Sequence, residues 1–425
     1  MRPTTLRSAL GGCLVFALSA GAGLLSEPVH AQSSPSYVLS PLNVRPTAMS
    51  ASLAEVARTS ARPMERTIDP RTATGPTAAR TAVATAPEAG PMMISPGFAG
   101  RAVRSMVDEA EYRALTEAAM AGSGDNSPIS EQNYGSGLYN TPYHYNDYLQ
   151  FPSPYYAPYR SIGWLNFQAS DGGWYWCTAA LIDRAILVTA GHCVFDGGAN
   201  DPSGWNLDGY FYPGYSAADG ANQRYGRCRV LQWGTTWDWY TTGALNGGYD
   251  VGVAVCGRLE NARWSYVNNY LPGGRVGYLA FCYLNCRPPY WFNSQYGYPS
   301  NYYSGGEMTV SQHLEITRQE IPNWAPNVGL DFVFGSGMLG GSSGGPHISN
   351  VGDLSDSAAN QGQYTDRNVI MAVTSWGFTS NTSLKIQGAS PLSGVDNAND
   401  FRSMFNAMCY TSRQTYGTWS CTFLP

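Results

Sequence analysis

The sequence predicts a mostly β-stranded protein with one C-terminal helix. From Arg160 onward, short apolar runs alternate with glycine-rich turns, as at Ile186–Thr189, Val251–Val255 and Val369–Val373, and such spacing favours a β-sandwich or barrel. The chain is also rich in glycine, proline and tyrosine (48, 27 and 29 residues) and poor in charge (13%), which suits strands and turns better than helical bundles. Only the stretch from Asn397 to Met408 has apolar residues at helical spacing near the C-terminus, so we expect a helix there.

The length of the chain limits the number of domains, and its net charge limits the kinds of partner that we expect. Its 425 residues allow about two to three domains. The formal net charge of −5 gives no basic footprint for nucleic acid or for an anionic membrane. We therefore expect neither partner.

The first 31 residues have the pattern of a secretory signal peptide. Arg2 and Arg7 form a positive region, an apolar stretch runs from Ala9 to Leu25, and Val29-His-Ala31 resembles a cleavage site. A membrane anchor is the alternative, but the stretch is interrupted by glycines and is short for a span of about 20 residues. We expect a protein that is secreted, to the periplasm or the medium, and free of the membrane once the signal is removed.

Residues 32–155 differ in composition from the rest. From Ser33 to Gly97 alanine, proline, threonine, serine and arginine dominate, and such a stretch buries too little apolar surface to offset its ordering entropy. A short helix is expected from Ala102 to Ala121, and an extended loop from Tyr134 to Tyr159. We interpret 32–155 as a largely disordered pro-region.

Eight cysteines follow the signal, an even number that implies four disulfides in an exported protein. Zinc binding by Cys282 and Cys286 is the competing interpretation, but no paired histidines follow at zinc spacing. We therefore expect no metal. The eight residues are Cys177, Cys193, Cys228, Cys256, Cys282, Cys286, Cys409 and Cys421.

Two segments carry candidate acid–base residues. A run of β-forming residues delivers His192 to the end of a strand, next to Cys193. Asp250 immediately precedes the apolar run that starts at Val251, so its carboxylate is expected to be partly buried and to need a donor. A neutral histidine is a natural partner for it; a turn-forming aspartate is the alternative. Asp238, between two tryptophans, is the second candidate for this role.

The third segment is glycine-rich and contains a candidate nucleophile. Ser343 lies within Gly340-Gly-Ser-Ser-Gly-Gly-Pro346. The glycines let successive N–H groups point at one spot, so those of Gly341 and Ser343 are candidates to hold a developing oxyanion, each worth about 3 to 4 kcal/mol in a transition state. A flexible glycine–serine loop is the alternative.

Together these segments resemble the chymotrypsin-like serine peptidases. The motifs that carry the resemblance are Thr189-Ala-Gly-His-Cys193, Asp250-Val-Gly-Val253, Gly341-Ser-Ser-Gly-Gly-Pro346 and Ser375-Trp-Gly377, and their order of His, Asp and Ser is that of the family. Arg160-Ser-Ile-Gly163, Gly277-Tyr278 and Gly297-Tyr-Pro299 further resemble its bacterial glutamyl-endopeptidase-like branch. The resemblance covers about residues 155–395.

The resemblance implies a peptidase domain at 156–425 with two six-stranded antiparallel β-barrels, at about 156–265 and 266–395, followed by the C-terminal helix. It implies a serine endopeptidase with His192, Asp250 and Ser343 as catalytic triad, acting on protein or peptide substrates without a cofactor. Ser375, Trp376 and Gly377 would pair with the substrate backbone, and Gly337 and Met338 would lie near the base of the primary pocket. A Cys177–Cys193 disulfide resembles the family's active-site bridge, and Cys409–Cys421 is expected because it closes a short loop.

The sequence departs from the family pattern at two places. Ser342 stands where digestive members have the aspartate that pairs with a freed N-terminus, so activation must differ. Thr374 precedes Ser375 where glutamyl-specific members place a histidine. The expected pocket walls, 334–338 and 375–378, contain no charged residue, and an unpaired buried charge is costly. We therefore expect a neutral or broad preference; hydroxyls from Ser336, Thr374 and Ser375 keep an acidic preference open.

Some alternatives stay open. The same fold can serve as an inactive binding module, and the same triad can serve an esterase. The turn from Asp196 to Asp201 has carboxylates that suit calcium, although a solvated turn is the simpler interpretation. The pro-region is a candidate inhibitor or folding aid, removed so that the mature chain begins between Tyr134 and Ile162.

Overall fold

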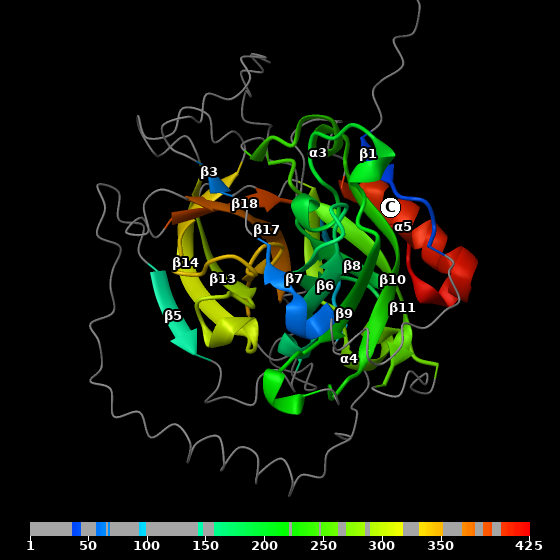
Figure 1. Ribbon diagram of the computed structural model, residues 1–425, viewed down its shortest axis with the longest axis horizontal. Coiled ribbons are helices and arrows are strands. Elements are labelled where there is room, and N and C mark those ends of the chain that lie inside the picture. Colours follow the sequence, from blue (N-terminus) through cyan, green and yellow to red (C-terminus); the bar gives the residue numbers. More distant parts are fainter. Residues whose placement is uncertain are drawn as a thin grey trace, which may run out of the picture. The chain divides into compact units, whose positions relative to one another are not determined.

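The computed structural model describes most of the chain from residue 157 onward and five short stretches before it (Figure 1). All of them belong to one compact unit, Pro35–Pro425. The expected signal peptide and the expected helix at 102–121 lie outside the described residues. The described ranges are 36–43, 57–64, 67–68, 93–98, 143–147, 157–220, 223–245, 248–261, 269–284, 290–317, 331–351, 368–378, 386–392 and 401–425.

Six antiparallel strands close the first barrel. They pair in the order β10-β11-β8-β7-β6-β9, and β9 pairs back with β10, so the sheet has no free edge within this ring. Aromatic and aliphatic side chains fill the interior, among them Leu165, Phe167, Phe195 and Phe211, all fully buried. The strands are β6 (Ile162–Gln168), β7 (Trp174–Leu181), β8 (Ile186–Thr189), β9 (Asp208–Pro213), β10 (Arg227–Thr236) and β11 (Gly252–Glu260).

A second ring of six antiparallel strands follows. The pairing order is β16-β13-β14-β15-β18-β17, and β17 pairs back with β16. Strand β12 (Ala280–Leu284) lies outside this ring and runs parallel to β17. The two expected six-stranded barrels are therefore confirmed. The ring strands are β13 (Tyr290–Gly297), β14 (Thr309–Thr317), β15 (Phe332–Gly335), β16 (Pro346–Ser349), β17 (Val369–Phe378) and β18 (Ile386–Pro391).

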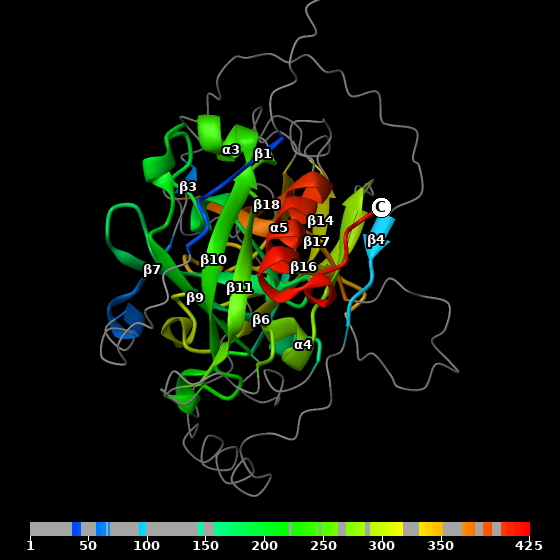
Figure 2. The same ribbon diagram turned by 90° about the vertical axis from the view of Figure 1, so that its right-hand side faces the viewer.

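The C-terminal helix α5 (Phe401–Tyr416) confirms the expected helix and extends beyond its expected end at Met408. The expected first turn, 397–400, lies outside the described residues. Phe401, Met404, Phe405 and Met408 recur at helical spacing and are buried, because this stripe packs on strands β10 and β11 (Figure 2). Two short helices, α3 (Trp237–Thr242) and α4 (Pro272–Val276), lie earlier in the chain. No helix in this part of the chain is long and apolar enough to cross a membrane.

Five short strands precede the barrels, in a region for which the sequence predicts little order. β1 pairs with β10, β2 with β7, β3 with β17, β4 with β12, and β5 with β14. Four of them add main-chain hydrogen bonds to a barrel strand, and β4 adds them to β12, which lies outside the ring. Such pairing needs little apolar surface of its own, so composition did not reveal it. Their bounds are β1 (Tyr37–Leu39), β2 (Arg62–Pro63), β3 (Thr67–Ile68), β4 (Met93–Ser95) and β5 (Tyr143–Asp147).

Candidate active site

His192 lies in a short 3-10 turn directly after β8, as the run of β-formers predicts. The disulfide between Cys193 and Cys177 ties this turn to β7. A Cβ at Gly191 would lie 2.9 Å from both Oδ1 of Asp250 and the Trp239 ring. Glycine is therefore needed beside His192 to let the carboxylate approach.

Asp250, which immediately precedes β11, holds His192 at two points. Its Oδ1 accepts the backbone N–H of His192, and its Oδ2 accepts Nδ1 of the ring, both at 2.7 Å. Both side chains are fully buried. Because a carboxylate only accepts hydrogen bonds, Nδ1 carries the hydrogen of this contact, and in the neutral form of the ring Nε2 therefore has the lone pair. The alternative carboxylate, Asp238, lies in the first turn of α3.

A third donor to Asp250 comes from the second barrel. The hydroxyl of Ser375 on β17 donates to Oδ2 of Asp250 at 2.6 Å. Sequence reasoning assigned Ser375 to substrate backbone pairing and missed this side-chain contact, since no local pattern links two positions 125 residues apart. The neighbouring Trp376 is buried, and its Nε1 donates to Asp331 at 2.8 Å.

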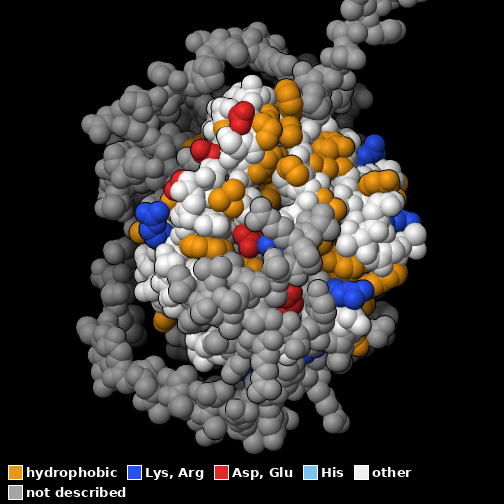
Figure 3. All heavy atoms as spheres, turned by 45° about the vertical axis from the view of Figure 1, so that its right-hand side comes forward, with side chains coloured by type: hydrophobic (Ala, Val, Ile, Leu, Met, Phe, Trp, Pro, Cys, Tyr) orange, Lys and Arg blue, Asp and Glu red, His pale blue; other side chains and the backbone are white. Residues whose placement is uncertain are grey.

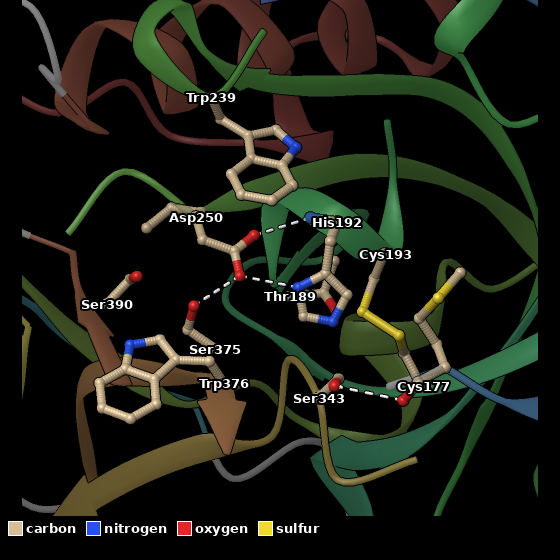
Figure 4. Close-up of polar contacts among 12 residues, drawn as sticks. Cys177, Thr189, His192, Cys193, Trp239, Asp250, Ser343, Ser375, Trp376 and Ser390 are labelled. Carbon is tan, nitrogen blue, oxygen red and sulfur yellow. Dashed lines mark hydrogen bonds and ion pairs between the residues drawn. A yellow bond between two sulfur atoms is a disulfide. The ribbon is translucent and has the colours of Figure 1, made fainter. Parts of the chain in front are cut away.

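The loop that carries Ser343 is held by β7. The N–H of Thr178 donates to the carbonyl of Ser343 at 2.8 Å, and its hydroxyl donates to the carbonyl of Gly341 at 2.9 Å. Gly344 adopts a φ of +76°, and a Cβ there would lie 2.0 Å from Oγ1 of Thr189. The glycines thus allow this loop to pack tightly against the first barrel, and the loop is not a flexible linker. Figure 4 shows Ser343 of this loop near Cys177 and His192.

The described structure joins His192 to Asp250 but contains no hydrogen bond between His192 and Ser343. Nε2 of His192 is buried without a hydrogen-bond partner. The hydroxyl of Ser343 instead donates to the carbonyl oxygen of Met64 at 3.4 Å, and the N–H of Gly341 donates to the same oxygen at 2.9 Å. In Figure 4 the free ring nitrogen of His192 faces the side on which Ser343 lies.

The expected pocket residues adjoin a buried polar network inside the second barrel. The hydroxyl of Ser336 donates to Oε1 of Gln295 at 2.7 Å, and Nε2 of Gln295 donates to Thr374 at 2.9 Å. The hydroxyl of Thr374 is 3.2 Å from the carbonyl of Gly345, to which it donates. Each hydroxyl has a single hydrogen to donate. The hydroxyls of Ser336, Thr374 and Ser375, which the sequence suggested as donors to an acidic substrate side chain, therefore already donate to other groups of the protein.

The carbonyl groups of Gly337 and Met338 accept hydrogen bonds from neutral side-chain amides. Nδ2 of Asn301 donates to the carbonyl of Gly337 at 2.9 Å, and Nε2 of Gln387 donates to that of Met338. No local pattern pointed to Gln387, because it lies on β18, 49 positions from Met338.

The disulfides agree with the two expected pairs. Cys177–Cys193 and Cys409–Cys421 are present, and Cys228–Cys256 joins β10 to β11. Among the described residues, the only cluster of metal-ligand type is Cys177, His192 and Cys193, and a disulfide supplies no thiolate for a metal. In the turn considered for calcium, Asp201 caps a 3-10 turn by accepting the N–H of Ser203 at 2.8 Å.

No protein-family model matches the chain, and no curated protein matches it. Among solved structures it is similar to the protease Anisep from Arthrobacter nicotinovorans, with 21% identity over 59% of this chain and 96% of that one and a TM-score of 0.44. It is also similar to the thermostable serine protease AL20 from an extremophilic microorganism, with 19% identity, coverage of 58% of this chain and 97% of that one, and a TM-score of 0.43. A third similar structure is a Glu endopeptidase in complex with MPD, which has 18% identity to this chain, covers 62% of it and 95% of its own length, and gives a TM-score of 0.41.

Proposed function

We propose that the chain is a secreted serine endopeptidase that cuts peptide bonds through an acyl-enzyme intermediate. The observation that carries the proposal is the two-point hold of Asp250 on His192, which fixes the ring with a free, basic Nε2. A histidine oriented in this way, in a buried site beside a serine in a glycine-rich turn, matches the requirements of nucleophilic catalysis.

The proposed reaction follows from these roles. Nε2 of His192 accepts the proton of Ser343 as Oγ attacks the substrate carbonyl, and it later gives the proton to the leaving amine. Asp250 stabilises the cationic ring. The N–H groups of Gly341 and Ser343 hold the oxyanion, and water then hydrolyses the acyl-enzyme by the same steps in reverse order.

The substrate is proposed to bind as an added strand. Ser375, Trp376 and Gly377 on β17 pair with the backbone before the scissile bond, and the side chain before that bond enters the pocket near Gly337 and Met338. The residues after the bond would then lie toward the first barrel. Peptides and proteins are the proposed substrates. On the face shown in Figure 3, the basic side chains drawn in colour are scattered rather than gathered in one patch.

Export and processing complete the proposal. Residues 1–31 act as a cleaved signal, and 32–155 as a removable pro-region. The disulfides and the pattern of the first 31 residues support an oxidising destination, the periplasm or the medium.

A serine-directed phosphonylating probe tests the function. We expect one equivalent to attach to Ser343 of the processed protein, mapped by peptide mass spectrometry, and His192→Ala to abolish attachment. Absence of labelling in a folded, processed protein would favour the inactive binding module. Labelling with turnover of esters but not of peptides would favour an esterase.

A further inference from the structure

We infer that the stretches 61–64 and 67–68 of the pro-region occupy the substrate cleft in the direction opposite to a substrate, and so keep the enzyme latent before processing. This inference rests on the proposed function and adds the identity and polarity of the inhibitor. Three sets of contacts carry it: one on the first barrel, one at the oxyanion donors and one on the second barrel.

On the first barrel the segment is anchored by backbone and side chain. β2 runs parallel to β7, and the N–H of Met64 donates to the carbonyl of Trp176 at 2.9 Å. The guanidinium of Arg62 donates to the Tyr175 hydroxyl at 2.7 Å and lies 4.8 Å from the centre of that ring. Upstream, Ala57 is buried with 1% exposure. The segment is therefore seated on the barrel, not merely near it.

At the candidate catalytic centre, a main-chain carbonyl takes the place proposed for the substrate carbonyl. The oxygen of Met64 accepts the N–H of Gly341 at 2.9 Å and the hydroxyl of Ser343 at 3.4 Å. The hydrogen of Ser343 is thereby directed at Met64, while Nε2 of His192 has no hydrogen-bond partner. The contact needed to activate the nucleophile is not made in this arrangement.

On the second barrel the chain continues along the strand proposed to bind substrate. β3 pairs parallel with β17, with Thr67 opposite Gly377 and Ile68 opposite Phe378. A substrate cannot pair with this edge while β3 holds it, because each main-chain group of the edge forms one such bond.

The direction of the segment is opposite to that of a productive substrate. From N- to C-terminus it passes from β7 of the first barrel, through Met64, to β17 of the second. A substrate whose residues before the scissile bond pair with β17 runs from the second barrel to the first. The side chain of Met64 agrees with the reversal, since it packs against the first-barrel core rather than in the second-barrel pocket.

Reversed polarity explains how a peptidase can hold a peptide in its own cleft without cutting it. The Met64 carbonyl reaches one proposed oxyanion donor, the N–H of Gly341. The residues before Met64 lie where the part of a substrate after the scissile bond belongs, and Thr67 and Ile68 lie where the part before that bond belongs. The leaving amine is then not on the side where His192 would protonate it.

The test uses the full chain and the phosphonylating probe. In one variant, residues 61–68 are replaced by eight glycine and serine residues; in the matched control, residues 71–78 are replaced in the same way. The probe is added briefly, and intact mass identifies label on the unprocessed species alone. We expect the first variant to label at least about ten times faster than wild type, equivalent to 1.4 kcal/mol, and the control to label at the wild-type rate.

A second measurement guards against a folding defect in the variant. A synthetic peptide of residues 57–70 is added to the processed wild-type enzyme, with a scrambled peptide as control. We expect competitive inhibition by the native order only, and an intact peptide by mass. Equal labelling of unprocessed wild type and variant, lack of inhibition, or cleavage after Met64 would each overturn the inference. If the processed enzyme itself fails to label, the proposed function fails instead.

Discussion

The hydroxyl of Ser375 donates a 2.6 Å hydrogen bond to Oδ2 of Asp250, the same oxygen that accepts Nδ1 of His192. A residue of the second barrel thus helps to position a carboxylate at the end of a first-barrel loop. The contact makes the alignment of His192 depend on the docking of both barrels.

Ser375→Ala should therefore lower kcat by about tenfold with little change in KM, because a hydrogen bond to a charged group is worth roughly 1.5–3 kcal/mol and the backbone that would pair with substrate is retained. Ser390→Ala is the matched control: Ser390 also donates to a buried carboxylate, that of Asp331, at 3.1 Å. Steady-state kinetics on one peptide decides. Equal losses in both variants would indicate a general effect on the second barrel.

Ser343→Ala, His192→Ala and Asp250→Asn should each reduce turnover by about 10⁴-fold or more, since the three act as one unit. The losses should not multiply when two changes are combined. The measurement is peptide hydrolysis by purified protein with wild-type circular dichroism. Near-normal turnover of Asp250→Asn would remove Asp250 from the proposal and return Asp238 as the candidate.

Gly344→Ala should destabilise the fold by at least about 3 kcal/mol, because the residue has positive φ and the new methyl group would overlap Thr189 and the carbonyl of Thr178. Gly274→Ala, in α4, is the control, since a Cβ there meets nothing within 4 Å. Urea unfolding at constant m compares the two. Equal stability of both variants would show that the loop relaxes freely.

Cleavage should follow a neutral side chain and not arginine or lysine. The hydroxyls of Ser336, Thr374 and Ser375 donate to Gln295, Gly345 and Asp250. The described residues of the expected pocket walls, 334–338 and 375–378, therefore offer neither a carboxylate for a cation nor a free hydroxyl donor for an acid. Matched peptides that differ only before the scissile bond, compared by kcat/KM, test this. A strong preference for arginine or lysine would show that the pocket is misplaced.

Ionisation of Glu307 should lower the free energy of unfolding as pH rises from about 4.5 to about 7. The reason is that burial raises the pKa of its carboxyl from 4.5 to about 7. In this window the folded chain holds a proton that the unfolded chain has lost, so the stabilisation present below pH 4.5 is lost as pH passes 7. Glu307→Gln, which stays neutral, should flatten the curve and be more stable at pH 8 by roughly 1–3 kcal/mol.

Asp171→Asn is the contrast for that experiment. The hydrogen bond from the N–H of Gly173 lowers the pKa of Asp171. The contribution of Asp171 to the free energy of unfolding therefore changes with pH in the opposite direction to that of Glu307: it is present above the unfolded pKa and is lost as pH falls. Urea unfolding of the full chain at several pH values measures both. A Glu307→Gln variant with the wild-type pH profile would contradict the assignment.

Local pattern was enough to predict the parts of this protein that depend on local structure. β-forming runs predicted strands at Ile186–Thr189 and Val369–Val373, and helical spacing predicted α5, which extends beyond the expected end at Met408. Four ordered motifs also suggested two barrels, because the strands that carry them recur in a fixed order. The strands and the helix follow from propensity and periodicity, which act over a few residues, whereas the two barrels were implied only by the resemblance of the motifs to a known family.

Tertiary structure alone decided the contacts between distant segments. The hydrogen bond of Ser375 to Asp250, the amide network around Gln295, and the position of Met64 at Gly341 join residues 41 to 277 positions apart. A low-complexity segment showed no tendency to fold by itself, yet barrel strands order parts of it by pairing with its main chain, which carries no sequence signature. The sequence therefore determined which residues are able to do chemistry, and the packing of the two barrels and the pro-region determined which partners those residues contact.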